Sequence, residues 1–230
     1  MPPEASAVAL RPALDRVCDE LRLQVEPVAK DRLLAYLALL QRWNATYNLT
    51  AVRDPAEMLT QHLADCLAVV GAFRRALGAG SARRLLDVGS GGGLPGVVLA
   101  ILESGWSVTC VDAVGKKAAF VRQVAVELGL RNLAAEHARV ERLRMAGFDL
   151  ITSRAFASLG DFVNLTRALL AKDGVWAAMK GKTPSAEFSA LPPDIDVFHV
   201  EPIDVPGLDA ERCIVWMRES ASAAPGLVHS

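Results

Sequence analysis

The chain has 230 residues, 52% of them hydrophobic, a mean hydropathy of +0.26 and a formal net charge of −1. This length accommodates one sizeable α/β domain with a small additional part, and the composition excludes an intrinsically disordered chain and one that is polycationic as a whole. No apolar run reaches the roughly 18 uncharged residues of a membrane span, and the chain does not open on a basic stretch followed by a long apolar one. We therefore expect a cytoplasmic protein without a membrane partner.

The N-terminal part of the sequence predicts helices. Residues 12–44 have helical spacing, with Leu33, Leu37, Leu40 and Trp43 on one side, and residues 58–77 form a second helical region. The segment between them, NATYNLTAVRDP, is polar and rich in turn residues, which predicts a loop. We expect a helical extension over residues 1–60 and a domain of a different kind over residues 61–230.

From Arg83 onwards, strand-like runs alternate with helix-like runs. The strand-like runs cover residues 83–88, 106–113, 132–138, 148–155, 174–181, 194–203 and 212–219. Alternation of this kind predicts an α/β fold whose sheet is mostly parallel, with helices on both faces. The last two runs follow each other without a helix, which predicts a hairpin and an antiparallel C-terminal strand.

A glycine-rich turn follows the first strand. Five glycines fall within the eight residues from Gly89 to Gly96, and Asp112 ends the second strand 23 residues after Gly89. Such a turn lies where parallel sheets bind ligands, and an acid about 20 residues further on meets ribose hydroxyls. The run from Gly91 to Gly96 also matches the dinucleotide pattern, but in a poor register with the strand. Asp87, two residues before the first glycine, suits the amino and sulfonium charges of S-adenosylmethionine (SAM) better than a pyrophosphate. The turn favours SAM, with NAD and a purely structural turn as alternatives.

Five segments in order resemble one protein family: WNATYNLTAVRDPAEMLTQHLADCLAV, LLDVGSGGGLPGVVLAI, VDAVGKKAAFVRQV, ITSRAFASL and MKGK. The glycine segment resembles motif I of class I SAM-dependent methyltransferases. Together the five resemble the RsmG (GidB) family, which methylates N7 of a guanine in a 16S ribosomal RNA hairpin loop, and the match runs from about Leu33 to Lys182. The resemblance implies a Rossmann-like class I methyltransferase sheet after an N-terminal helical extension.

The resemblance also implies the cofactor and the partner. The cofactor is SAM, the partner is 16S rRNA within the 30S subunit or a precursor particle, and the target is guanine 527 of the 530 loop. We expect a monomer. Cofactor contacts are carried onto the turn and onto the ends of the following strands, with Asp112 added from the general methyltransferase pattern: Gly89, Gly91, Leu94, Asp112, Val140, Glu141 and Arg154.

Some of these residues also have a structural interpretation. Leu94 suits helix-to-sheet packing, Glu141 suits a surface ion pair with Arg142 or Arg144, and Arg154 suits a structural ion pair. The position of Arg154 at the carboxyl end of a strand favours a role in orienting the cofactor, the guanine or both, since its planar fork matches carboxylates and guanine edges.

Charge is distributed unevenly along the chain. Residues 113–144 carry seven Lys/Arg and three Glu, whereas residues 183–230 carry two Arg and eight acids. A basic middle part suits an anionic partner, although a solvated helix surface gives the same pattern. Four lysines are candidate RNA contacts: Lys116, Lys117, Lys180 and Lys182.

No metal site is expected. The four cysteines are far apart, which predicts buried free thiols, and His62 and Asp65 alone do not make a metal site. A hydrogen bond that secures the N-terminal helices to the following domain is the better interpretation of His62 and Asp65.

Guanine N7 carries a lone pair and no proton, so its methylation needs positioning and electrostatics and no general base. The sequence agrees, because SRAFAS stands where methyltransferases of exocyclic amines carry [DN]-P-P-[YF]. The same segment contains no cysteine, which methyltransferases of pyrimidine C5 need there as a nucleophile. Phe156 suits base stacking or core packing. The alternatives are a methyltransferase for a small molecule or protein, a non-catalytic nucleotide-binding module and a dehydrogenase.

Overall fold

The computed structural model describes residues 3–78, 82–154, 156 and 158–220, with side chains from residue 9 onwards. In chain order its elements are α1 (Pro3–Glu20), α2 (Pro27–Tyr47), α3 (Pro55–Met58), the π-helical η1 (Leu59–Ala64), α4 (Asp65–Leu77), β1 (Arg83–Val88), α5 (Gly96–Leu102), β2 (Trp106–Asp112), α6 (Gly115–Glu127), β3 (Leu133–His137), η2 (Val140–Arg142), β4 (Phe148–Ser153), α7 (Leu159–Thr166), η3 (Arg167–Leu169), β5 (Leu170–Lys180), α8 (Ser185–Phe188), β6 (Ile195–Pro202) and β7 (Cys213–Glu219).

The seven strands form one sheet in the order β3-β2-β1-β4-β5-β7-β6. The first five in this order pair in parallel, and β7 pairs antiparallel with both of its neighbours. The predicted fold class is confirmed, including the antiparallel C-terminal strand. Strands β2 and β3 are added on one side of β1, and β4 and the later strands on the other side. Ligands bind at such a switch point, here between β1 and β4, beyond the carboxyl ends of the strands.

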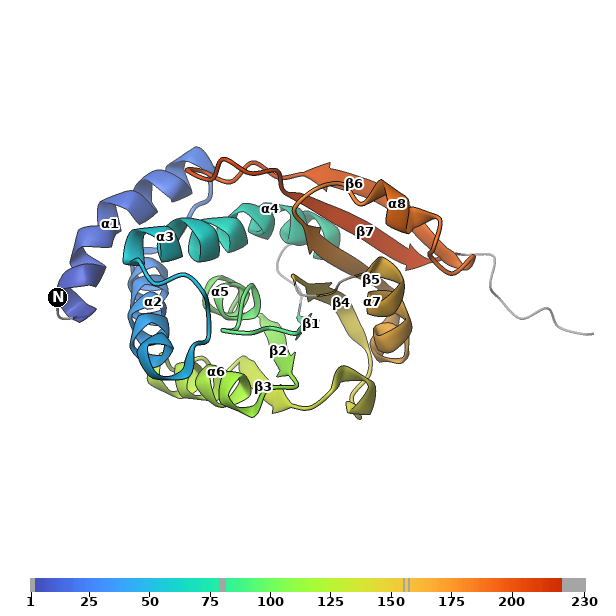
Figure 1. Ribbon diagram of the computed structural model, residues 1–230, viewed down its shortest axis with the longest axis horizontal. Helices are drawn as coiled ribbons and strands as arrows, with labels where there is room; N and C mark the ends of the chain where they lie inside the picture. Colours follow the sequence, from blue (N-terminus) through green and yellow to red (C-terminus); the bar gives the residue numbers. More distant parts are fainter. Residues whose placement is uncertain (1–2, 79–81, 155, 157, 221–230) are drawn as a thin grey trace, which may run out of the picture.

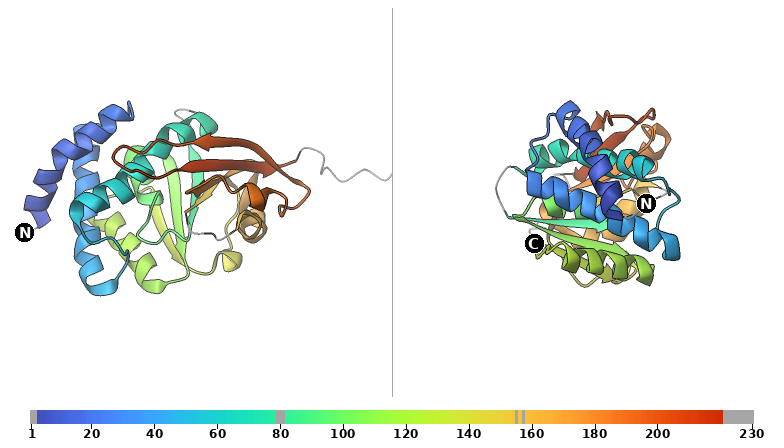
Figure 2. Two further views of the ribbon diagram at one scale, coloured as in Figure 1. Left: turned by 45° about the horizontal axis from the view of Figure 1, so that its top comes forward. Right: turned by 90° about the vertical axis from the view of Figure 1, so that its left-hand side faces the viewer.

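Helices cover both faces of the sheet (Figure 1). On one face α2, α4, α5 and α6 share a core with the strands, in which Leu85 of β1 and Val108 of β2 meet Phe120 of α6. On the other face Leu86 and Ile151 pack with α7. Helix α1 packs on α2 at the outside of the molecule, away from the sheet (Figure 2). The N-terminal helices are thus part of the main core.

The predicted division at residue 60 stays a prediction. In the structure residue 60 lies within the continuous helical run of α3, η1 and α4. The side chain of Asp54 begins this run by accepting hydrogen bonds from the backbone N–H groups of Ala56 and Glu57, at 2.9 and 3.0 Å.

Two predicted elements have different bounds in the structure. The helix expected over residues 12–44 is two helices, because Glu26 precedes Pro27 and adopts an extended conformation with ψ 146°. Helix α7 ends at Thr166, and β5 begins at Leu170, before the expected residue 174. An irregular register between β4 and β5 pairs Phe148 with Leu170, which draws the earlier residues into the strand.

Candidate functional site

The glycine turn after β1 has a backbone that only glycine adopts easily. Gly91 has φ 58°, and an added Cβ there would meet nothing within 4 Å, so this residue faces open space. Gly93 has φ 86°, and an added Cβ would lie 2.4 Å from a methyl carbon of Val97. Gly91 is therefore needed for its backbone conformation alone, and Gly93 is needed both for its conformation and for its close packing against Val97.

Asp87 lies beneath this turn and is fully buried. Its Oδ2 accepts a hydrogen bond from the N–H of Gly96 at 2.9 Å, which fixes the start of α5. Its Oδ1 is buried and has no hydrogen-bond partner among the described residues. Burial raises the pKa of Asp87 to about 7. Its place under the turn differs from the expected contact with the charged groups of a cofactor.

An apolar pocket of about 290 Å³ lies at the carboxyl ends of β1, β2 and β3. Four of the residues predicted to contact the cofactor line this pocket: Gly89, Asp112, Val140 and Glu141. Phe156 lines it as well. Asp112 holds its loop by accepting hydrogen bonds from the N–H groups of Gly91 and Val114, at 2.9 and 2.8 Å. Glu141 is exposed and takes part in none of the ion pairs between described residues, so the pair with Arg142 or Arg144 that its structural interpretation would require is not seen.

A second pocket, the turn pocket, has a volume of about 210 Å³ and lies along the glycine turn. The other predicted cofactor contacts line this pocket, namely Gly91, Leu94 and Arg154. The turn pocket shares Gly89 with the apolar pocket. Leu40 and Leu49 from the N-terminal part of the chain complete its wall. The structure thus brings all seven predicted residues to two pockets that meet at one glycine, while the roles assigned to these residues stay predictions.

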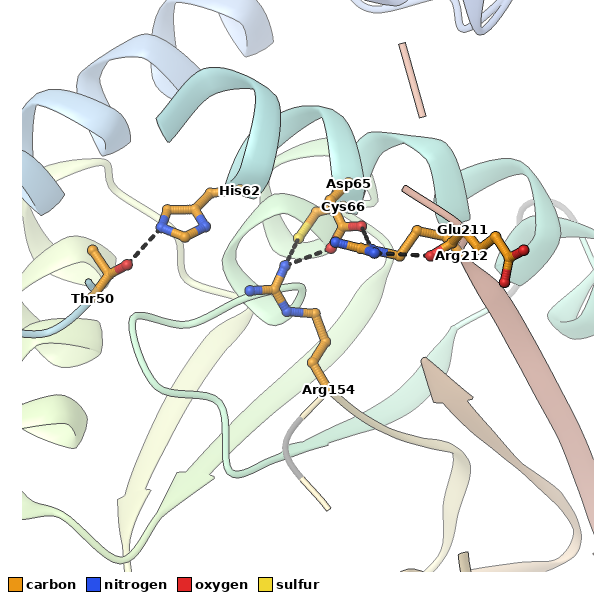
Figure 3. A network of polar contacts seen from close by, with 7 residues as sticks. All are labelled: Thr50, His62, Asp65, Cys66, Arg154, Glu211 and Arg212. Atoms are coloured by element: carbon orange, nitrogen blue, oxygen red, sulfur yellow. Dashed lines mark hydrogen bonds and ion pairs between the residues drawn. The ribbon is translucent and has the colours of Figure 1, made fainter. Parts of the chain in front are cut away.

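Arg154 belongs to a buried ionic network (Figure 3). Its Nη1 lies 2.7 Å from Oδ2 of Asp65 on α4, and the other oxygen of Asp65 accepts from Nε of Arg212 at 2.8 Å. Asp65 is only 5% exposed. Its single carboxylate thus holds two guanidinium groups that come from distant parts of the chain. Asp65 joins α4 to the residues after β4 and before β7, all within residues 61–230, so this contact does not tie the expected N-terminal extension to the domain that follows it. Arg154 has a structural partner as well as a place in the turn pocket.

The network also brings a cysteine to Arg154. Sγ of Cys66 lies 3.7 Å from Nη1 of Arg154, although no cysteine neighbours Arg154 in the sequence. Burial raises the pKa of the Cys66 thiol, and the side chain is fully buried, so a thiolate nucleophile is disfavoured there.

His62 of η1 lies beside this network and is held by Thr50 (Figure 3). Its Nε2 lies 2.9 Å from Oγ1 of Thr50, whose backbone N–H donates to the side chain of Asn44 at 2.9 Å. Burial lowers the pKa of His62, and the positive charge of Arg154 lowers it further, so the imidazole stays neutral near pH 7. Its Nδ1 is buried without a hydrogen-bond partner among the described residues.

A third pocket, the polar pocket, has a volume of about 390 Å³ and lies between η1, the end of β5 and the start of β7. His62 and Arg154 line both this pocket and the turn pocket. Its lining includes these polar side chains and one glycine: His62, Asp65, Arg154, Lys180, Gly181 and Arg212.

The predicted RNA contacts fall into two groups. Lys116 and Lys182 are exposed, and Lys117 is half-buried on α6. Lys180 instead donates to both oxygens of Glu187, at 3.0 and 3.2 Å, which neutralises its charge. Phe156 packs on Phe162 with ring centroids 5.2 Å apart, and it still borders the apolar pocket.

The remaining expectations concern cysteines, metals and membranes. The four cysteines are free and buried, as predicted. Within the part of the chain that the structure describes, no group of three or more His, Cys, Asp or Glu side chains could hold a metal ion. The described helices include none that is both long and apolar enough to cross a bilayer.

Sequence reasoning missed Thr50 and Arg212. Thr50 lies in a loop between two helices, and Arg212 lies just before the last strand, far from the glycine turn. Neither stands in a spacing that indicates a site. Only the fold brings them to the site, since it places Thr50 beside His62 of η1 and Arg212 beside Asp65 at the start of α4.

Comparisons with known proteins identify relatives over most of the chain. A family model described as GidB, rRNA small subunit methyltransferase G, matches residues 29–215. A protein of Methylibium petroleiphilum named ribosomal RNA small subunit methyltransferase G is 61% identical over 211 residues, covering 92% of this chain and 95% of that protein. A protein of the same name from Paracidovorax citrulli is 55% identical over 232 aligned positions, covering 96% and 95%.

Solved structures share the fold at low identity. TrmN from Thermus thermophilus is similar with a TM-score of 0.55 and 22% identity, over 70% of this chain and 53% of that one. A SAM dependent methyltransferase from Aquifex aeolicus has a TM-score of 0.54 and 16% identity, over 74% and 96%.

Proposed function

Because this chain belongs to the rRNA small subunit methyltransferase G (GidB) family, we propose that it transfers a methyl group from SAM to N7 of a guanine in 16S rRNA. The family excludes the dehydrogenase that the glycine pattern left open. The proposal extends to guanine 527 of the 530 loop as the target, and to a monomer that acts in the cytoplasm on the 30S subunit or a precursor particle.

The two pockets that meet at Gly89 carry this proposal. The apolar pocket suits an adenine ring, and the Asp112 carboxylate at its edge suits ribose hydroxyls. The turn pocket offers backbone close to open space at Gly91 and the charge of Arg154, which suit an amino-acid group. A ligand with a nucleoside half and an amino-acid half fits this pair of pockets, so the residues present fit SAM.

The residues of this chain act by positioning. When bound, SAM supplies an electrophilic methyl group. Leu40, Leu49 and Leu94 give the turn pocket an apolar wall, and Asp65 holds the Arg154 guanidinium in one orientation. His62 is neutral and Cys66 stays a thiol, which agrees with a reaction that needs neither a base nor a thiolate.

The test is a map of N7-methylguanine in 16S rRNA from cells with and without the gene, followed by transfer of labelled methyl from SAM by the purified protein. We expect one methylated guanine to disappear in the deleted strain and to be restored in vitro. Naked 16S rRNA, 30S subunits and precursor particles are compared as substrates. An unchanged methylation map, together with no transfer to any of the three, would refute the proposal.

A further inference from the structure

The polar pocket lies next to the proposed cofactor site without being part of it. It shares with the turn pocket only His62 and Arg154, and its other walls come from α4, the end of β5 and the residues around the start of β7. At about 390 Å³ it is the size of a small-molecule site and can take one nucleotide. A ligand in it would adjoin the turn pocket, the proposed site of the amino-acid half of SAM.

The charge of this pocket suits an anion. Its lining includes three cationic side chains and one carboxylate, since Arg154, Lys180 and Arg212 accompany Asp65. Lys180 is neutralised by Glu187, whereas Arg212 shares Asp65 with Arg154. Two guanidinium groups on one carboxylate leave a net positive charge.

Arg212 has donors to spare. Its Nε donates to Asp65 and its Nη1 to the carbonyl of Glu211 at 2.9 Å, while its Nη2 has no partner among the described residues. Arg212 is half-buried and held on two sides, so its remaining N–H groups are aimed before any ligand arrives. Phosphate oxygens are the acceptors that such a planar fork recognises.

The other end of the pocket suits a base. His62 is buried, neutral and fixed by Thr50, and its Nδ1 lacks a partner among the described residues. The guanidinium of Arg154 lies across from His62, with one terminal nitrogen turned to Asp65 and the other to the His62 side (Figure 3). A buried polar atom without a partner is costly unless a ligand satisfies it.

We propose that the polar pocket receives the target guanosine nucleotide after it has turned out of the RNA, with its base between His62 and Arg154 and a phosphate at Arg212. This inference rests on the proposed function. A base stacked in RNA cannot enter a pocket of this kind, and RNA-modifying proteins read bases that are splayed out of loops. The sequence-based RNA contacts were lysines, and this inference adds Arg212 and His62.

Blocking the pocket tests the inference without disturbing the ionic network. An added Cβ at Gly181 would lie 4.0 Å from Arg212 Nη1 and from the Glu211 carbonyl oxygen, so a side chain there fits and extends over the pocket. We expect Gly181→Phe to keep the wild-type dissociation constant for SAM and to lose methyl transfer to 16S rRNA at least tenfold in kcat/KM. The matched control is Gly105→Phe, an exposed glycine at the opposite end of the sheet with nothing within 4 Å of an added Cβ.

Removing the guanidinium tests the phosphate contact. Arg212→Gln is expected to raise KM for RNA about tenfold and to lower the slope of log affinity against log salt by about 1, with SAM binding unchanged. The matched control is Arg218→Gln on the same hairpin, where Arg218 is exposed and pairs with Asp196 at 3.1 Å away from the pocket.

The outcomes separate the two proposals. If the wild-type protein does not methylate 16S rRNA, the proposed function fails before the pocket is tested. If the wild type is active and Gly181→Phe keeps full kcat/KM, or Arg212→Gln keeps the wild-type KM and salt slope, the pocket assignment is overturned. Loss of SAM binding or of folding in Arg212→Gln, together with an active Gly181→Phe, would also overturn it and leave Arg212 a structural role.

Discussion

At the scale of single residues, the Asp65 carboxylate decides the geometry of the site. It is buried, and it holds Arg154 from the end of β4 and Arg212 from the start of β7. Removing one partner of a buried ion pair leaves an uncompensated charge, which costs more than the pair contributes. A substitution at Arg154 that keeps a positive charge beside Asp65 therefore separates the loss of the planar fork from the loss of the ion pair.

Arg154→Lys keeps that charge and removes the planar fork. Because only Nη1 of Arg154 contacts Asp65, a lysine ammonium can replace this contact, and we expect a melting temperature within a few degrees of wild type. Most RNA-dependent methyl transfer should be lost. Both quantities are measured on one preparation, by thermal melting and by transfer of labelled methyl. Full activity in a stable variant would exclude the functional role, and activity that falls only with the folded fraction would favour a structural one.

Asp112→Ala removes the carboxylate at the edge of the apolar pocket. Because Asp112 also accepts from the N–H groups of Gly91 and Val114, its loss both removes the ribose acceptor and loosens the turn. We expect the affinity for SAM to fall by roughly 1–3 kcal/mol, measured by titration calorimetry on the folded variant. Asp209→Ala, at an exposed position away from the pockets, is the control. An unchanged dissociation constant would remove Asp112 from the site.

Asp87 makes stability depend on pH. Its pKa in the folded protein is about 7, above the ordinary value of 3.8, because burial disfavours the charged form. A raised carboxyl pKa favours folding below about pH 4, and this contribution is lost as the pH rises to about 7. In urea unfolding across this range, the wild type should therefore lose stability relative to Asp87→Asn, which cannot ionise. A pKa unit corresponds to about 1.4 kcal/mol, so the relative change should amount to a few kcal/mol. A difference that is constant between pH 4 and pH 8 would contradict this account.

At the scale of elements, helix α2 supports the glycine turn. The hydroxyl of Tyr36, which is fully buried on this helix, donates to the carbonyl of Gly92 at 2.7 Å. Leu40, one turn further along, would lie 3.1 Å from a Cβ added at Gly92. The N-terminal helices therefore shape the turn pocket from outside the sheet.

Tyr36→Phe should loosen that turn. The carbonyl of the half-buried Gly92 loses its donor, so we expect about 1–3 kcal/mol less stability and weaker SAM binding. Tyr47→Phe on the same helix is the control, since Tyr47 is 43% exposed. Chemical unfolding and calorimetry measure the two effects. If both variants bind SAM like the wild type, α2 does not support the turn.

The sequence predicts regular elements better than their ends and better than the site. The run from Arg83 to Val88 is short and is followed directly by a glycine, and its strand bounds are confirmed. Helix α1 ends at Glu20, just before Arg22 with φ 51°, and α2 begins at Pro27, a break that the helical spacing of the leucines conceals. The glycine turn and Asp112 follow from local spacing, whereas Asp65, Thr50 and Arg212 meet only through tertiary packing, which leaves no pattern in the sequence.

At the scale of the whole molecule, charge is separated along the chain while the total stays near zero. The net charge is −1, yet residues 113–144 carry a net charge of +4. If this part contacts phosphates, RNA affinity should fall steeply as salt rises, because binding releases counterions.

Reversing Lys116 and Lys117 to Glu should lower RNA affinity and flatten the slope of log affinity against log salt. Both lysines lie on the first turn of α6 and take part in no ion pair between described residues. Lys172→Glu, at an exposed position on β5, is the control. Filter binding at several salt concentrations measures the slope, and a wild-type slope near zero would rule out electrostatic RNA binding.

The order of the last strands has a consequence for how the chain folds. Strand β6 precedes β7 in the sequence, yet β7 lies between β5 and β6 in the sheet. As the chain is synthesised, β6 therefore emerges with no neighbour to pair with, and the edge of β5 stays open until β7 follows. The edge of β5 is filled only once β7 has been made, and Arg212, the residue before β7, enters the site with it. The pocket wall that holds the RNA phosphate in our proposal is thus the last to form, so a nascent chain that stops before β7 is translated cannot capture the target nucleotide.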